Sequence, residues 1–340
     1  MISLISSTLI SLITLICALI IIAFFTLAER KVIAAVQRRR GPNVVGIFGL
    51  LQAVADGLKL VGKEILIPAK ANIDLFVFAP ILTFATSLIN WAFLPIGNFE
   101  NVIADQNVAI LYILAVSSIG VYGIILSGWS SNSRYAFLGA IRSTSQMVSY
   151  EVSMGLLLLP VIFCTGSFNL STINSIQGGS GWLLFVLLPV ACLFIISMLA
   201  ETNRTPFDLP EAEAELVAGY NVEYSSLTFA LFFLGEYGNM TILAVFTTIL
   251  FFGGWPIGVS ALWGLLVFIV KVMAVCFFTI FVRANLPRYR YDQLMSVGWE
   301  VILPLSLGYL IVVSNILRAF NGEPVVQELP FIGDLVLANS

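Results

Sequence analysis

The chain has 340 residues, of which 59% are hydrophobic and only 10% are charged, whereas a soluble globular domain carries about 25% charged residues. This composition excludes a water-soluble fold for most of the chain, and the mean hydropathy of +1.00 predicts that hydrocarbon is its main solvent. The formal net charge of -3, without a basic tail or stripe, argues against nucleic acid as a partner.

Apolar runs long enough to cross a bilayer as helices recur along the whole chain. Each span needs about 20 residues, and lipid favours helices because every backbone polar group must be satisfied within the protein. The predicted fold class is therefore all-α, a bundle of about eight transmembrane helices that forms a single integral membrane domain over residues 1–340. The predicted spans are 4–28, 72–94, 107–128, 147–165, 182–200, 224–251, 261–284 and 299–319.

The positions of lysine and arginine predict the orientation of these helices, because loops on the inner side of a membrane are enriched in positive charge. The segment between the first and second predicted helices carries eight basic residues, and later loops on the same side carry most of the others. Only Lys271 and Arg318 of the 16 fall elsewhere. An even number of helices then predicts that both termini lie on the outer side.

Residues 45–65, in the first inner segment, form a predicted amphipathic helix. Its polar stripe contains Gln52, Asp56, Lys59 and Lys63 at helical spacing. A helix that is too polar to span should lie along the membrane surface with its apolar side toward the lipid. That apolar side consists of Ile47, Leu51, Val54, Leu58, Val61 and Ile65.

The chain does not have the residue clusters that metal or haem sites require. It has no histidine, and its cysteines at 17, 164, 192 and 276 lie far apart in apolar runs. Iron–sulfur, haem and zinc sites need clustered Cys or His ligands, and no G-x-G-x-x-G follows a strand pattern. Any redox chemistry is therefore expected in partner proteins.

Four ionisable residues stand inside or at the ends of apolar runs: Glu151, Glu201, Glu236 and Lys271. Each costs about 2.5–3.5 kcal/mol or more if it faces lipid, so they are expected to point inward, toward one another or toward water. One interpretation is a structural Glu–Lys pair. The other is a proton path, because carboxylates at different depths can pass protons through intervening water.

Residues 201–223 form a predicted inner-side loop that is unusually acidic for that side of a membrane. Capping explains two of its acids, because Asp208 followed by Glu211 matches a helix N-cap box, with Gly219 as the helix stop. Like charges in so short a segment repel one another, which favours a functional role for the remaining acids. These are Glu213, Glu215 and Glu223, with Arg204 as the one arginine nearby.

Two long segments resemble the signature segments of subunit 1 of respiratory complex I, the proton-pumping NADH:ubiquinone oxidoreductase. They are GLLQAVADGLKLVGKE at 49–64 and PFDLPEAEAELVAG at 206–219. Shorter matches extend the resemblance over nearly the whole chain: AERK at 28–31, GPN at 41–43, SYEV at 149–152, ETNRTPFD at 201–208, Phe232-Phe233 before Glu236-Tyr237, and RYRYDQL at 288–294.

The resemblance implies a core membrane subunit of an enzyme, without covalent catalysis or a redox cofactor in this chain. Ubiquinone would be the substrate, while NADH, FMN and iron–sulfur clusters would be bound by partner subunits. Peripheral quinone-reducing subunits, small membrane subunits and membrane lipids are the implied partners. The high hydrophobicity is similar to that of mitochondrially encoded members, so the implied location is the mitochondrial inner membrane, with the bacterial plasma membrane as the alternative.

The resemblance also implies a ubiquinone access tunnel and a chain of carboxylates that couples quinone reduction to proton translocation. The tunnel mouth is expected among the first helix, the 45–65 helix and the sixth helix, with Arg30, Asp56 and Phe229 as wall residues. Arg142, Arg204 and Arg283 are the expected counter-charges. The implied proton-coupling residues are Glu151, Glu201, Asp208, Glu211, Glu213, Glu215, Glu223, Glu236 and Lys271.

Two alternatives use the same embedded charges. One is a membrane anchor of a related hydrogenase-type complex, which binding of quinone-site inhibitors would distinguish. The other is a stand-alone proton-coupled secondary transporter. Many such transporters show repeated halves with matching broken helices, a pattern that the sequence does not show.

Overall fold

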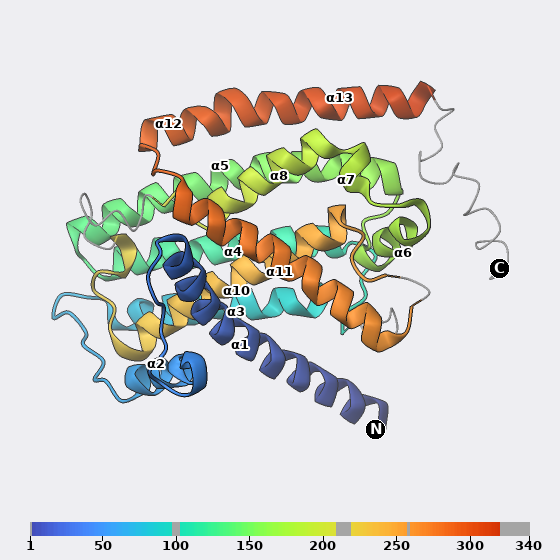
Figure 1. Cartoon of the computed structure of the whole chain (residues 1–340). Helices are drawn as coiled ribbons and strands as arrows, with labels where there is room; N and C mark the ends of the chain where they lie inside the picture. The colour runs from blue at the N-terminus through green and yellow to red at the C-terminus, as the bar shows by residue number, and fades with distance from the viewer. Residues whose placement is uncertain (1, 97–102, 209–218, 257–258, 320–340) are drawn as a thin grey trace.

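A computed structural model describes residues 2–96, 103–208, 219–256 and 259–319 (Figure 1). These residues form helices joined by loops, and the described ranges contain no strand. Seven of the described helical segments are long and apolar enough to cross a membrane, and a shorter apolar helix, α8, covers Leu188–Glu201. The predicted all-α, multi-pass architecture is therefore confirmed.

The helices follow one another as a succession of long rods with short elements between them. The long helices are α1 (Ile2–Val36), α3 (Ile73–Asn90), α4 (Ala109–Ser130), α5 (Arg134–Thr165), α10 (Ser226–Phe251), α11 (Ala261–Asn285) and α13 (Leu303–Ala319). The shorter elements are η1 (Ile47–Gly49), α2 (Gln52–Val61), η2 (Trp91–Phe93), α6 (Leu170–Ser180), α7 (Leu183–Val186), η4 (Gly219–Asn221), α12 (Tyr291–Ser296) and a π-helix, η5 (Val297–Ile302).

Helix α5 is much longer than the span predicted at 147–165. It begins at Arg134, so Arg134 and Arg142 lie in a helix and not in the predicted loop. One polar residue that suggested a late start, Gln146, is fully buried, and its side-chain NH2 group donates to the carbonyls of Ala200 and Phe207. Buried polar groups are tolerated when they are hydrogen-bonded, and therefore the helix continues through them.

The span predicted at 182–200 is divided in two. Leu187 leaves the helical conformation between α7 and α8, and Pro189 stands in the first turn of α8, where its missing N–H group is no loss. Helix α6 was not predicted at all. Its start is fixed by Asn169, whose side chain accepts a hydrogen bond from the Ser171 N–H, which is the usual capping arrangement.

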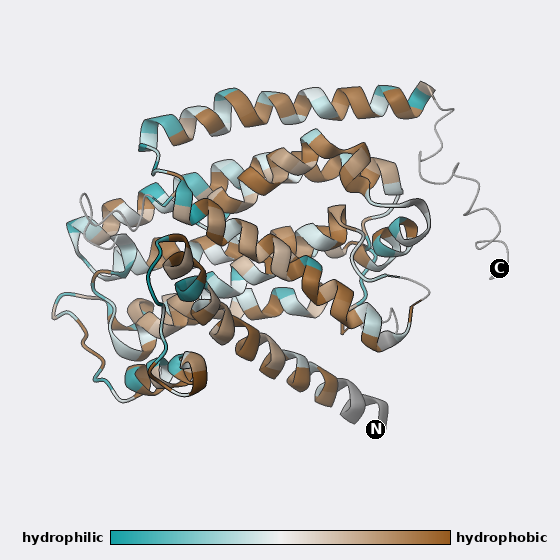
Figure 2. Ribbon diagram, in the orientation of Figure 1, coloured by the Kyte–Doolittle hydropathy of each residue, from teal (hydrophilic) through white to brown (hydrophobic). Residues whose placement is uncertain are grey.

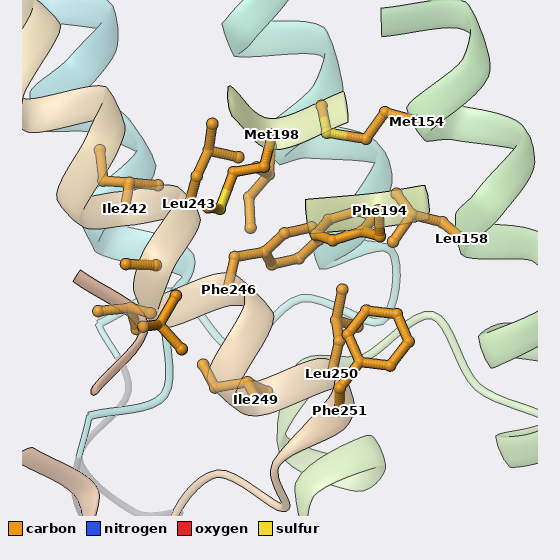
Figure 3. Close-up of a cluster of buried hydrophobic side chains, with 14 of the residues drawn as sticks. Met154, Leu158, Phe194, Met198, Ile242, Leu243, Phe246, Ile249, Leu250 and Phe251 are labelled. Atoms are coloured by element: carbon orange, nitrogen blue, oxygen red, sulfur yellow. The ribbon is translucent and has the colours of Figure 1, made fainter. Parts of the chain in front are cut away.

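Helix α10 lies at the centre of the bundle, packed against α1, α3 and α11, while α13 runs along α5 (Figure 1). An apolar core forms where α10 meets α5 and α8, and it includes Met154, Phe194 and Phe246 (Figure 3). The rings of Phe194 and Phe246 lie 6.0 Å apart. This apolar core fixes α8 against α10, and those two helices carry Glu201 and Glu236.

Polar residues gather at one end of the bundle, around α2, the N-terminal end of α5 and α12 (Figure 2). The C-terminal end of α1 lies there too, because α1 continues past the predicted span to Val36. Of the predicted 45–65 helix, only Gln52–Val61 is α-helical, after the short turn η1. Its apolar side is open to the surroundings, with Leu58 and Val61 each 69% exposed.

Candidate functional site

A buried cluster of charged side chains lies where α1, α10 and α11 meet the loop that follows α8. The Arg204 guanidinium contacts two acids, with Nε 2.8 Å from Oε1 of Glu236 and Nη1 3.6 Å from Oε1 of Glu29. Arg283 pairs with the same Glu29 carboxylate. The Tyr237 hydroxyl donates to the other Glu29 oxygen. The cluster therefore joins four separate segments of the chain.

The charges in this cluster balance, since two guanidinium groups face two carboxylates. Both Arg204 and Glu29 are only 3% exposed, and the Arg204 guanidinium also lies over the Tyr237 ring, 4.4 Å from its centroid. Charges removed from water are tolerated only when they are paired and hydrogen-bonded. Arg204 and Arg283 are thus both paired with acids, and their role as counter-charges in proton coupling stays a prediction.

Glu29 and Tyr237 received no role in the sequence analysis, although both belong to quoted motifs. Glu29 could have been predicted as an embedded acid, because it comes directly after an apolar run, as Glu201 does. For Tyr237 no sequence signal distinguishes a hydrogen-bonding tyrosine from a packing one. Their assignment depends on contacts between residues 208 positions apart.

Glu201 lies beside this cluster but outside its network of ion pairs. It is 6% exposed, and its Oε2 atom has no hydrogen-bond partner among the described residues. An unpaired carboxylate oxygen is expensive to bury, and such an atom is normally satisfied by ordered water or by a proton. Glu201 therefore differs from Glu29 and Glu236, whose carboxylates are paired with arginine.

Glu201 lines two small cavities. One has a volume of about 40 Å³ and is also lined by Glu236 and Asn239. The other has a volume of about 30 Å³ and is also lined by Asn239 and Ser117. A single water needs about 10–15 Å³ of such space, so each cavity has room for at least one water between polar side chains.

The second cavity leads toward Glu151 on α5. The Ser117 hydroxyl lies 3.3 Å from Oε1 of Glu151, to which it donates a hydrogen bond. Glu236 and Glu201 therefore line one small cavity, and Ser117, which lines the other cavity with Glu201, contacts Glu151. Carboxylates separated by one or two waters can exchange protons, and this is the chemistry that the arrangement permits.

Asp208 lies at the start of the acidic loop and is 3% exposed. Its Oδ2 is 3.2 Å from Nη2 of Arg288, and the Tyr289 N–H donates to the Pro206 carbonyl. These contacts fasten the beginning of the loop to the segment between α11 and α12. Arg288 is not among the counter-charges expected from the sequence, which are Arg142, Arg204 and Arg283.

Of the other acids in the predicted loop, Glu223 is among the described residues and lies in the turn between η4 and α10. Gly219, the predicted helix stop, begins η4. Glu211, Glu213 and Glu215, together with the predicted capping box, lie outside the described residues. Arg142 is placed on α5 with its guanidinium over the Tyr291 ring, 5.8 Å from the centroid.

Lys271 does not join the acids. Its ammonium group donates to the carbonyls of Gly253 and Gly254 and lies 5.1 Å from the centroid of the Trp182 ring. These carbonyls follow the C-terminal end of α10, where basic side chains are favoured. Because Glu236 lies 17 residues before Gly253, roughly 25 Å separates the two sites along α10. The Glu–Lys pair that the sequence left open is not formed in the described chain.

The three residues expected at a tunnel mouth lie on elements that meet. Arg30 on α1 pairs with Asp56 on α2, with 2.6 Å between Nη1 and Oδ2. The Ser226 hydroxyl at the start of α10 donates to the Leu60 carbonyl, 2.9 Å away. Helix α2 is therefore attached to both α1 and α10, and the tunnel mouth itself stays a prediction.

Phe229 begins a ladder of aromatic rings along α10. Its ring lies 6.0 Å from that of Phe233, and the ring of Phe233 lies 4.5 Å from that of Tyr237. Residues four apart lie on one face of a helix, so the ladder runs from the end of α10 near α2 to the buried charged cluster. It connects the region of Arg30 and Asp56 with Glu29 and Arg204.

Comparison with known proteins agrees with the motifs. A family model described as NADH dehydrogenase matches residues 9–314. NADH-ubiquinone oxidoreductase chain 1 of Chondrus crispus is 56% identical over 324 residues, covering 94% of this chain and 99% of that protein. The corresponding protein of Arabidopsis thaliana is 57% identical over 309 residues, covering 89% and 94%. An NADH-quinone oxidoreductase subunit of Paramagnetospirillum magneticum is 57% identical over 310 residues, covering 90% of each. The predicted family is confirmed: this chain belongs to the NADH dehydrogenase family.

Proposed function

We propose that this chain is the membrane subunit of an NADH:quinone oxidoreductase that admits ubiquinone from the bilayer and passes protons inward from the site of its reduction. The family and the names of the relatives support membership of this enzyme complex. The observation that carries the proton role is that Glu201 lines both cavities, one shared with Glu236 and the other with Ser117, which bonds to Glu151.

The proposed quinone route begins where α1, α2 and α10 meet. The isoprenoid tail of ubiquinone prefers hydrocarbon, and the exposed apolar side of α2 lies at this junction. The head group is a flat ring, and aromatic side chains bind flat rings by offset stacking. The ladder that starts at Phe229 offers such faces, while Arg30 and Asp56 supply polar groups beside it.

Replacing Phe229 with alanine is expected to raise the KM for a short-tailed ubiquinone by about 2- to 10-fold, the equivalent of one lost ring contact. The rate of NADH oxidation by ferricyanide, which does not use the quinone site, should be unchanged. Leu227→Ala is the matched control, because Leu227 lies on the same helix and is 44% exposed. An unchanged quinone KM in the Phe229 variant would exclude this residue from the route.

The proposed proton chain starts with the loop acids and continues inward. Asp208, Glu211, Glu213, Glu215 and Glu223 would receive protons near the quinone-reducing partner subunits, and Glu236, Glu201 and Glu151 would relay them. Glu29 joins the proposal because it shares Arg204 with Glu236. Arg142, Arg204 and Arg283 act as counter-charges. Lys271 is left out, because its contacts belong to the other end of α10.

Changing Glu236 to glutamine is expected to lower NADH:quinone turnover and proton pumping together, while oxidation by ferricyanide remains. The amide keeps the shape of the side chain but cannot release a proton, and loss of one general acid–base group typically costs about 10²–10⁴-fold. Glu300→Gln is the control, since Glu300 is an exposed acid in a membrane helix that bonds only to nearby Ser296 among the described residues.

The result for Glu236 has two distinct alternatives. Normal turnover and pumping would contradict its relay role. Equal loss of quinone and ferricyanide activities would indicate failed assembly, because removing a charge from the Arg204 cluster unbalances it. Measuring the amount of assembled enzyme separates these outcomes.

The proposal also includes the setting of the chain. Partner subunits would hold NADH, FMN and the iron–sulfur clusters, and the membrane would be the mitochondrial inner membrane or a bacterial plasma membrane. The relatives that are similar to this chain come from both eukaryotes and bacteria. Both termini are proposed to lie on the side opposite the lysine- and arginine-rich loops.

A further inference from the structure

A basic cavity lies at the C-terminal end of α1, and none of its lining residues belongs to the charged cluster. Its volume is about 330 Å³. Helix α1 is long and apolar enough to cross a membrane, so its basic end is expected at the membrane surface. The residues that line the cavity are Lys31, Ala35, Arg39, Arg40, Gly41, Pro42 and Asn43.

The positive charges of this cavity are not balanced by the described chain. The ion pairs among the described residues use Arg30, Arg204, Arg283, Arg288 and Arg290, and none involves the basic residues of the cavity. Lys31 donates to the carbonyl of Phe48, and Arg39 donates through Nε to the Gln37 side chain. Both contacts are to neutral groups, so the cavity retains a strong preference for an anion.

Exposed apolar side chains stand directly beside these cations. Val44 is 95% exposed, Ile47 is 77% exposed and Phe48 is 72% exposed. The chain folds back here, because Gly49 has a φ of +74° and lies so close to Pro42 that a Cβ would come within 2.3 Å of the Pro42 carbonyl oxygen. Only glycine fits such a position, and the fold-back keeps Phe48 next to Lys31.

We propose that this cavity binds the phosphate of an anionic glycerophospholipid, with its acyl chains over Val44, Ile47 and Phe48. Arginine guanidinium groups match phosphate oxygens in a bidentate manner, and basic pockets beside membrane helices are suited to acidic lipid head groups. The apolar rim is what distinguishes a lipid from free phosphate, which would leave those side chains in water. A choline head group is disfavoured, because its own positive charge would meet the same cations.

The site can be tested on the purified, fully assembled enzyme with lipids that carry a photoactivatable acyl chain. Phosphatidylglycerol is compared with phosphatidylcholine, and the labelled residues are mapped by mass spectrometry. Labelling by phosphatidylglycerol is expected to fall on residues 41–48. In Arg39→Gln/Arg40→Gln, its half-saturating concentration should rise about 30-fold, the effect of removing two surface cations.

Two further variants keep the test decisive. Arg39→Lys/Arg40→Lys preserves the charge and should retain most of the preference for phosphatidylglycerol. Arg134→Gln removes an exposed cation elsewhere on the same face and should leave the labelling unchanged. Assembly and ferricyanide activity of every variant are measured first, so a fall in labelling is read only from intact enzyme.

Several results would overturn the proposal. Equal labelling by the two lipids would indicate only generic contact with acyl chains. Displacement of the label by millimolar inorganic phosphate would assign the site to a free anion. A chemical cross-link from Arg40→Lys to another subunit, with no lipid label, would assign the surface to a protein partner.

Discussion

Methionine at position 204 is expected to prevent accumulation of stable assembled enzyme. Arg204 lies between Glu29 and Glu236, and both the arginine and Glu29 are almost fully buried. Removing one partner of a buried ion pair leaves uncompensated charge and typically costs about 3–5 kcal/mol. A whole domain is stable by only about 5–15 kcal/mol. The measurements are the yield of assembled complex and its thermal unfolding midpoint.

The same argument predicts partial rescue by a second substitution. Arg204→Met combined with Glu236→Gln removes the orphaned carboxylate, and Arg283 remains as the partner of Glu29. Losing both members of a buried pair is far less costly than losing one. The double variant should therefore unfold at a higher temperature than Arg204→Met alone, even though its quinone-linked activity stays low.

Two comparisons guard this prediction. Arg204→Lys should be less stable than the native enzyme, because an ammonium group does not have the planar guanidinium fork that reaches two carboxylates. Arg318→Met, which removes an exposed arginine near the end of α13, should be neutral. If Arg204→Met assembled normally, or if the double variant were less stable than the single one, the pairing described above would not be the source of stability.

The transmembrane helices could be predicted because long apolar runs have few alternatives in lipid. Their ends could not, and α5 shows why. From the sequence alone, its polar first half is predicted to be a loop. In the structure this half is helical, and the Gln146 side chain donates to the carbonyls of Ala200 and Phe207. Those partners come from a different part of the chain. The break at Leu187 and the capped start of α6 likewise depend on local geometry that hydropathy does not record.

The candidate site shows the same division between local and tertiary information. Embedded acids are visible in the sequence, because lipid makes each of them costly. Their partners are not visible. Glu29 and Tyr237 became site residues only through contacts with Arg204 and with each other. Lys271 looked equivalent to the acids in hydropathy, but the carbonyls after α10 already account for its position.

The structure separates the acids into two classes with different physical roles. Glu29 and Glu236 are held by guanidinium groups, so their charge contributes to how α1, α10 and α11 are joined. Glu201 forms no ion pair among the described residues and lines two cavities. A change at Glu236 is therefore expected to affect stability as well as the proposed proton transfer. A change at Glu201 is expected to affect the proposed proton transfer alone.

Glutamine at position 201 is accordingly expected to give the cleanest functional loss. The amide has the same shape, and no ion pair among the described residues is broken, so assembly and thermal stability should stay near those of the native enzyme. NADH:quinone turnover and proton pumping should fall by about 10² or more, the usual cost of losing an acid–base group. Oxidation of NADH by ferricyanide should not change, and Glu300→Gln again serves as the control.

Comparing Glu201→Gln with Ser117→Ala tests which residue of the proposed proton route causes the loss of turnover. Ser117 lines the second cavity and donates to Glu151, but water can replace its hydroxyl. Its loss should slow turnover much less than the loss of Glu201. If Glu201→Gln pumped protons at the native rate, no proton could be passing through the one acid that borders both cavities. The order Glu236, Glu201, Glu151 would then have to be abandoned, although the family of the chain would be unaffected.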